Sequence, residues 1–188
     1  MHHGKRHSAK GAGAAPATAR DPHGLEQLLG EKTTPADFCS ELAKLFQVRA
    51  TEVALLQLEG GLLKFLFPEA LKTAGAIPLS SSTAIAAHTV STRKVELFNS
   101  FARVKHASIF ETVRLGASDQ ADSAAHAPIQ KLMSAPIVDS DGEVLGVIQV
   151  CRKGFDAVSA GADFTLADLT NLERAAVIVA KASFLQIA

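Results

Sequence analysis

The sequence contains no tryptophan and no tyrosine, and its 188 residues include only two cysteines. Without these aromatic residues the chain lacks the usual stacking anchors of proteins that bind nucleobases, so we do not expect a nucleic acid partner. Cys39 and Cys151 lie far apart in sequence and have no Cys-x-x-Cys spacing. This arrangement argues against a zinc site and against a disulfide framework. We therefore expect no metal, no cofactor and two inert thiols that are buried or half-buried.

Long apolar runs are also missing. No run approaches the roughly 20 residues that span a bilayer. Lys5 and Arg6 are not followed by the apolar stretch of a secretory signal. The sequence therefore predicts a cytoplasmic protein without a membrane partner. Its composition, 47% hydrophobic and 20% charged, is that of an ordinary globular domain.

Residues 1–32 predict a flexible basic arm, because they are rich in Gly, Ala, Pro, Ser and Thr and show no sustained hydrophobic period. Through Gly24 this arm carries four Lys or Arg against one acid. An excess of positive charge can attract nucleic acid or an anionic membrane, but four charges are few and favour a solvated tail. Residues 33–188 remain for one folded domain.

A central β-hairpin is predicted around Asp141-Gly142, which separates the apolar runs 135–138 and 144–150. Asp-Gly supplies the positive φ angles that a tight hairpin turn needs. The run 144–150 has little polar surface, which predicts a strand covered on both faces. Gly146 within it predicts the close approach of another backbone or a helix.

Further hairpin and helix signals complete an α+β pattern. Thr34-Pro35-Ala36-Asp37 predicts the start of a helix ending near Gln47, because Thr caps the helix, Pro fits its first turn and Asp favours the positive end of its dipole. The other predicted elements are a hairpin of 51–58 and 62–67, short strands at 77–79 and 95–98, a helix at 83–92 capped by Ser80, Ser81 or Ser82, and a last helix from Thr165 to Phe184. Residues 99–130 are the least regular segment. This order predicts an antiparallel sheet of about five to six strands with helices segregated from it.

Three segments resemble the GAF domain, a small-molecule sensory module related in shape to PAS domains. They are 77–99 (IPLSSSTAIAAHTVSTRKVELFN), 133–150 (MSAPIVDSDGEVLGVIQV) and 164–168 (FTLAD). The resemblance implies N- and C-terminal helices on one face of the sheet, and a helix plus a variable loop on the other. It also implies a non-catalytic sensory or regulatory domain in signal transduction, which transmits ligand occupancy through its terminal helices.

Carried onto this chain, the ligand site lies between the strands, the helix at 82–92 and the segment 99–113. The candidate ligand contacts are Ser82, Thr83, His88, Phe98, Asn99, Phe101, Arg103, His106 and Phe110. Basic side chains in the segment favour an anionic ligand if they face inward. These are Arg103, Lys105, His106 and Arg114. Capping, core packing and a solvated basic surface explain the same residues without a ligand.

Cyclic-nucleotide-binding members of the family carry Asn-Lys, then Phe, then Asp-Glu. Lys153, Phe164 and Asp168 match this pattern, whereas Arg152 replaces the Asn and Leu169 replaces the Glu. The two departures argue against a cyclic nucleotide. A lysine and an acid placed in this way can also form a structural ion pair.

Some GAF proteins reduce free methionine sulfoxide, a reaction that needs an attacking and a resolving thiol together near the pocket. Neither Cys39 nor Cys151 lies in the segment where those thiols are expected. No Ser-His-Asp order, paired carboxylates or P-loop is present either, so we do not expect an enzyme. The alternatives are a ligand-free dimerisation or docking module and, third, a reductase of this type.

The last predicted helix carries a broad apolar stripe, and the family resemblance implies a homodimer through the terminal helices. We expect the dimer interface at Leu169, Leu172, Ala176 and Val179. Further apolar residues at Ala175, Ile178 and Leu185 widen the stripe beyond what one sheet covers and suggest a partner helix. Because 188 residues leave no room for an effector domain, output goes through a separate effector protein, or the chain is a piece of a longer one.

Overall fold

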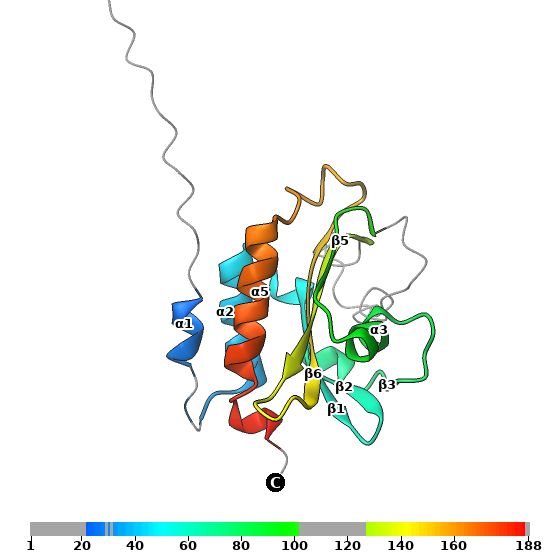
Figure 1. Ribbon diagram of the computed structural model, residues 1–188. Coiled ribbons are helices and arrows are strands. Elements are labelled where there is room, and N and C mark those ends of the chain that lie inside the picture. Colours follow the sequence, from blue (N-terminus) through cyan, green and yellow to red (C-terminus); the bar gives the residue numbers. More distant parts are fainter. Residues whose placement is uncertain (1–21, 29, 31, 102–126, 187–188) are drawn as a thin grey trace, which may run out of the picture.

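The computed structural model describes residues 22–28, 30, 32–101 and 127–186. Within them, one antiparallel sheet lies between a layer of helices and the single helix α3 (Figure 1). Its six strands run in the order β3-β2-β1-β6-β5-β4. They are β1 (Val53–Glu59), β2 (Leu62–Phe67), β3 (Ala76–Pro78), β4 (Glu96–Phe98), β5 (Ile129–Val138) and β6 (Val144–Lys153). The helices are α1 (His23–Glu26), α2 (Pro35–Phe46), α3 (Ile85–Thr92) and α5 (Leu166–Val179), with 3₁₀ turns at Ala50–Glu52, Glu69–Leu71 and Ser183–Leu185. The expected α+β fold is confirmed.

The central hairpin of β5 and β6 turns at Gly142, whose φ is +82°. The Asp139 side chain accepts hydrogen bonds from the backbone N–H groups of Asp141 and Glu143, both at 2.9 Å. β6 lies between β1 and β5, and its residues 146–151 are all buried. The prediction of a strand covered on both faces is therefore confirmed.

β5 begins earlier than its apolar run predicted, at Ile129 rather than near residue 135. The extra residues include Gln130 and Lys131, which do not resemble a buried strand. Both are satisfied by the loop after β6, because Gln130 donates to the Gly154 carbonyl at 3.1 Å and Lys131 pairs with Asp163 at 2.9 Å.

Gly146 explains how closely β1 and β6 approach. A Cβ atom added at this position would lie 2.0 Å from the Leu56 carbonyl oxygen, so any side chain would push the two strands apart. The close backbone approach predicted at Gly146 is confirmed.

Helices α2 and α5 begin with the same local device. Thr34 and Asp37 form a reciprocal capping box on α2, and Thr165 and Asp168 form one on α5. α2 ends as expected, with Gln47 in the left-handed region at φ +53°. α5 differs from the prediction because it stops at Val179, and a separate 3₁₀ turn contains Phe184.

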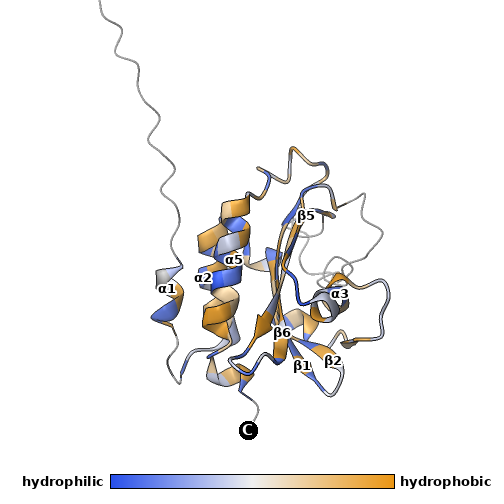
Figure 2. Cartoon of the chain, in the orientation of Figure 1, coloured by the Kyte–Doolittle hydropathy of each residue, from blue (hydrophilic) through white to orange (hydrophobic). Residues whose placement is uncertain are grey.

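The sheet separates two apolar cores. Side chains from α1, α2 and α5 pack on one face, and side chains from α3, β2 and β3 pack on the other. Adjacent residues of β5 therefore belong to different layers, since Met133 faces the terminal helices and Leu132 faces α3. Figure 2 shows the hydrophobic strands between the more mixed surfaces of the helices.

The packed part of the chain reaches further toward the N-terminus than residue 33. Leu25 of α1 is only 2% exposed and belongs to the core formed with α2 and α5. Residues 22–28, assigned from the sequence to the flexible arm, therefore pack on the domain. The rest of that prediction, residues 1–21, lies outside the described residues.

The residues expected at a dimer interface on α5 pack against the core of their own chain. Leu172 and Val179 are fully buried, Ala176 is buried and Leu169 packs against the same core. These side chains cover the sheet of their own chain. The wide stripe at Ala175, Ile178 and Leu185 is likewise buried with residues of α1 and α2, which supply the partner helix.

Among the described residues, none of the helices combines the length and apolarity that crossing a membrane would require.

Candidate functional site

A row of polar residues crosses the face of the sheet that α3 covers. Glu96 on β4 lies directly opposite Ser134 on β5, and Ser134 lies opposite Gln149 on β6. Residues directly opposite in an antiparallel pair point to the same side of the sheet. Ser134 and Gln149 are buried in a layer that is otherwise mostly apolar. We call Glu96, Ser134 and Gln149 the polar row.

Two side chains of α3 contact this row. The hydroxyl oxygens of Thr89 and Ser134 lie 2.7 Å apart, and Gln149 donates from Nε2 to the Ser134 hydroxyl at 3.3 Å. Because the Thr89 hydroxyl donates to the Ile85 carbonyl at 3.0 Å, its proton is already engaged and Ser134 must be the donor between the two. The result is a directed chain of hydrogen bonds from the Gln149 amide to the backbone of α3.

At the edge of the row, His88 faces Glu96. The distance from His88 Nε2 to Glu96 Oε1 is 2.9 Å, and the two side chains are 37% and 23% exposed. α3 thus contacts the sheet through a fully buried pair of hydroxyls and, one residue earlier, through a half-exposed imidazole and carboxylate.

α3 begins later than expected, which changes the role of two candidate contacts. Its first residue is Ile85, and Ala84 occupies the cap position without a side-chain hydrogen bond. The serine that helps the turn is Ser81, whose hydroxyl accepts from the Ala84 N–H at 3.2 Å. Ser82 and Thr83 are exposed and precede the helix, so the expected helix start at Thr83 is wrong and capping does not explain either residue.

Phe98 and Phe101 meet edge to face, with ring centroids 6.3 Å apart and planes at 69°. Both belong to the layer beneath α3. Asn99 has a structural role, because its side chain donates to the Phe164 carbonyl at 3.0 Å and accepts from the Phe164 N–H at 2.9 Å. It fastens the end of β4 to the chain just before α5. The remaining candidates, Arg103, His106 and Phe110, and with them Lys105 and Arg114, lie outside the described residues.

The residues compared with the cyclic-nucleotide motif hold the fold together. The Arg152 guanidinium lies 4.3 Å from the centre of the Phe164 ring and donates to the carbonyls of Ala162 and Phe46. Lys153 is buried and donates from Nζ to the Thr51 carbonyl at 3.3 Å. Asp168 accepts the Thr165 N–H at 2.8 Å within its capping box, one residue before Leu169 packs on the helical core.

The two cysteines lie in different cores. Cys39 belongs to the core under the terminal helices, and Cys151 to the core under α3, with the sheet between them. Both are fully buried. Burial raises the pKa of the Cys39 thiol well above its usual range, so this thiol is a poor source of thiolate.

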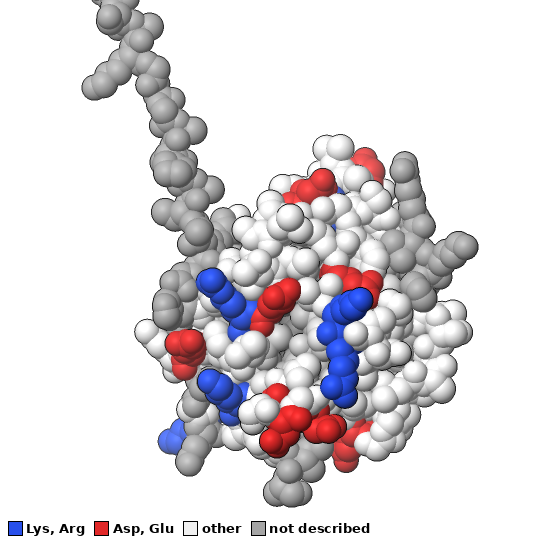
Figure 3. Space-filling model, viewed as in Figure 1, with Lys and Arg blue, Asp and Glu red and all other residues white. Residues whose placement is uncertain are grey.

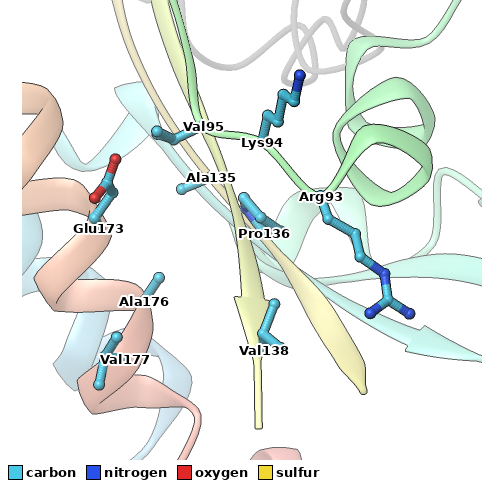
Figure 4. Close-up of a pocket in the computed structure, with 9 residues that line it drawn as sticks. All are labelled: Arg93, Lys94, Val95, Ala135, Pro136, Val138, Glu173, Ala176 and Val177. Carbon is cyan, nitrogen blue, oxygen red and sulfur yellow. The ribbon is translucent and has the colours of Figure 1, made fainter. Parts of the chain in front are cut away.

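A groove lies at the edge of β5, between residues 93–95, which precede β4, and α5 (Figure 4). Its volume is about 510 Å³, and it is lined by Arg93, Lys94, Val95, Ala135, Pro136, Val138, Glu173, Ala176 and Val177. The groove exists because β4 pairs only with residues 132–134 of β5. Beyond them comes Pro136, which has no N–H and keeps its place in the β5–β6 ladder only if its nitrogen faces the β4 side. A second hollow, of about 500 Å³, lies between α1 and α5.

Sequence reasoning missed Glu96, Ser134 and Gln149 as a unit. A signal was available, because Ser134 and Gln149 are single polar residues within otherwise apolar strands, where a side chain needs a hydrogen-bonding partner. The register that brings the three together was not readable from the sequence. Among the residues that the structure describes, no three His, Cys, Asp or Glu side chains gather as a metal site would require.

A sheet between terminal helices on one face and α3 on the other, with polar groups under α3, is the architecture of a sensory, ligand-binding module. The chain belongs to the GAF domain family, whose model matches residues 36–182. A search of curated proteins finds no match.

Solved structures share this fold. The GAF domain of an Acinetobacter phosphoenolpyruvate-protein phosphotransferase is 12% identical, covering 84% of this chain and 87% of that chain, with a TM-score of 0.57. The GAF domain of a two-component sensor histidine kinase from Bacillus halodurans is 19% identical over 78% and 92% of the chains, with a TM-score of 0.51. A type II free methionine-R-sulfoxide reductase from Thermoplasma acidophilum is 17% identical over 83% and 92%, with a TM-score of 0.51.

Proposed function

We propose that this chain is a non-catalytic sensory or regulatory GAF domain in signal transduction, which binds a small molecule beside α3. The observation that carries the proposal is the chain of hydrogen bonds from Gln149 through Ser134 to Thr89. Polar groups in an apolar layer cost free energy unless they are bonded. A contact made by hydroxyls can exchange partners when a ligand arrives, because each hydroxyl both donates and accepts.

The route from this contact to the terminal helices runs through β5. Ser134 faces α3, while its neighbours Met133 and Ala135 pack in the core under α5. A ligand that binds one position of α3 better than another would therefore bias the packing of α5. Occupancy shifts the helices only as far as the ligand distinguishes the two arrangements.

The placement of the cysteines supports a non-catalytic role. The reductase from Thermoplasma acidophilum shares the fold, so the fold alone does not decide between sensor and enzyme. A reductase of this type needs two thiols that can reach each other. In this chain the sheet separates Cys39 from Cys151, and we expect replacement of both by alanine to leave any ligand response intact.

The test is native mass spectrometry of the freshly purified chain, followed by a thermal-shift screen of amino acids, carboxylates and cyclic nucleotides. A bound molecule at 100 times its Kd stabilises the fold by about 2.7 kcal/mol, or roughly 5–10 °C in Tm for a domain of this size. Ser134→Ala should weaken that response, whereas the exposed turn variant Ser140→Ala should keep it. The same spectrum counts the chains in each particle and so tests the homodimer.

A ligand-free docking module is the second candidate. It is favoured by the tight packing of α3, in which Ile85, Ala86 and Ala87 are all buried against the sheet. An empty particle that no compound stabilises would support this candidate and would contradict the sensor.

A further inference from the structure

Exposed apolar side chains gather at one end of the molecule. The loop between β6 and α5, residues 154–165, presents Phe155 at 73% exposure and Val158 at 88%, and Leu166 follows at 76%. These are three of the five large hydrophobic residues that are exposed among the described residues. Single exposed apolar residues need no explanation, but three within twelve positions, in one loop and at the start of the helix that follows it, are an exposed apolar group of the kind that binds a partner. We call Phe155, Val158 and Leu166 the apolar patch.

The loop that carries this patch is held in one conformation by its own hydrogen bonds. The Ser159 N–H donates to the Asp156 carboxylate at 2.7 Å, and the Asp156 N–H donates to the Ser159 hydroxyl at 3.0 Å. The Gly161 N–H donates to the Val158 carbonyl at 3.1 Å. Phe155 and Val158 therefore project from a hydrogen-bonded turn rather than from an unconstrained loop.

Contacts with the sheet fix the loop from below. Lys131 donates to the Gly161 carbonyl at 2.5 Å and pairs with Asp163, and Arg152 donates to the carbonyl of Ala162. Gly154 packs so closely that an added Cβ would lie 2.5 Å from the Ala160 nitrogen. A surface that is already ordered loses little conformational freedom on binding, which favours affinity.

The surroundings of the patch are acidic. Residues 154–168 contain three aspartates and no Lys, Arg or His. Hydrogen bonds from Ser159 lower the pKa of Asp156, so its carboxylate stays charged at neutral pH. Two cations anchor the loop: Lys131 is only 5% exposed and pairs with Asp163, and Arg152 is half-buried with its guanidinium over the Phe164 ring. In Figure 3 the top of the molecule, where this loop lies, shows acidic and uncharged atoms with only traces of blue.

We propose that the apolar patch docks a segment of a separate protein in which apolar side chains are flanked by Lys or Arg. Phe155 would pack against the apolar side chains of that segment, and Asp156 and Asp163 would face its flanking cations. Complementary charge guides association and excludes wrong partners. The aspartates around the patch repel anionic lipid surfaces and nucleic acid, so neither of these is the occupant. Because Asn99 ties the chain before α5 to β4, the surface is joined directly to a strand under α3.

The test is selection of peptides from a random phage-displayed library on the full chain, followed by fluorescence polarisation with the enriched peptides. The proposal requires an aromatic or aliphatic centre flanked by Lys or Arg, and binding that weakens as salt rises. Phe155→Ser should reduce affinity tenfold or more, because apolar anchors dominate such interfaces. Val177→Ser is the matched control, since Val177 is an exposed apolar residue of α5 outside the patch, and it should leave affinity unchanged.

Three outcomes would overturn the proposal. They are enriched peptides without basic residues, no enrichment above an unrelated protein, and equal affinity for wild type and Phe155→Ser. A thermal melt establishes that the variant is folded, as expected for a residue that is mostly exposed. Size-exclusion chromatography adds a fourth: if Phe155→Ser converts a dimer into monomers, a second copy of this chain covers the patch.

Discussion

The hydrogen bond between Thr89 and Ser134 can be tested by a double-mutant cycle. Thr89→Val keeps the shape of the side chain and removes the hydroxyl, and Ser134→Ala removes the other partner. Both residues are fully buried, and their oxygens lie 2.7 Å apart. If the bond exists as described, the two substitutions must interact in the free energy of unfolding.

The expected sizes follow from what each substitution leaves unbonded. Thr89→Val should cost about 1 kcal/mol, because Ser134 keeps the hydrogen bond from Gln149. Ser134→Ala should cost about 1–3 kcal/mol, because it deprives Gln149 of its acceptor as well as Thr89 of its donor. The double variant should be more stable than the sum of the two losses predicts, by about 0.5–1.5 kcal/mol, since the shared bond is lost only once.

Urea unfolding, followed by circular dichroism, measures all four free energies. For a domain of this size, each kcal/mol also lowers Tm by roughly 2–4 °C, which gives an independent check. Additive effects, within the roughly 0.3–0.5 kcal/mol expected for independent sites, would refute the bond and, with it, the observation that supports the sensory function. A matched pair, Thr170→Val on the exposed face of α5 with Ser134→Ala, should be additive.

Three further predictions concern the frame around this site. Gly146→Ala should lower the free energy of unfolding by about 3 kcal/mol or more, because its Cβ would lie 2.0 Å from a carbonyl oxygen of β1. Gly142→Ala meets no atom and should lower it by only about 1–2 kcal/mol, because the residue has a positive φ. Equal losses in urea unfolding would contradict this prediction. Leu25→Ala should destabilise the fold by about 2 kcal/mol, and deleting the first 21 residues should not, so a truncation series read by Tm tests whether α1 belongs to the core. Burial raises the pKa of Cys39, so this thiol should resist iodoacetamide in the native state. Its contribution to stability should be present below the pKa of the unfolded thiol and should decline as the pH rises above that pKa. Rapid labelling of the native chain, detected by mass spectrometry, would indicate that the helix layer opens.

The sequence predicted the elements whose signals are local. Thr34 and Thr165 each cap a helix through contacts within four residues, and the hairpin turns contain glycines at positive φ, Gly60, Gly61 and Gly142. The start of α3 was misplaced because Ser81, Ser82 and Thr83 offer competing capping groups, and only the packing of the helix decides among them.

Long-range contacts account for the other differences. From the sequence, Leu172 and Val179 were predicted to contact a second chain, because the sequence alone does not show which helix packs against an apolar stripe. Folding brings α1 and α2 to that stripe. Ser134 and Gln149 were likewise separate polar residues until the β5–β6 register placed them side by side.

Both edges of the sheet end in strands of three residues, β3 and β4. Each edge also carries a proline: Pro78 lies in β3, and Pro136 occupies the stretch of β5 that β4 leaves uncovered. A proline cannot donate to an added strand, and a strand of three residues offers few backbone groups to pair with. The domain is therefore protected against growing by strand addition into fibrils, and a concentrated preparation should stay free of ordered aggregates for as long as the fold persists.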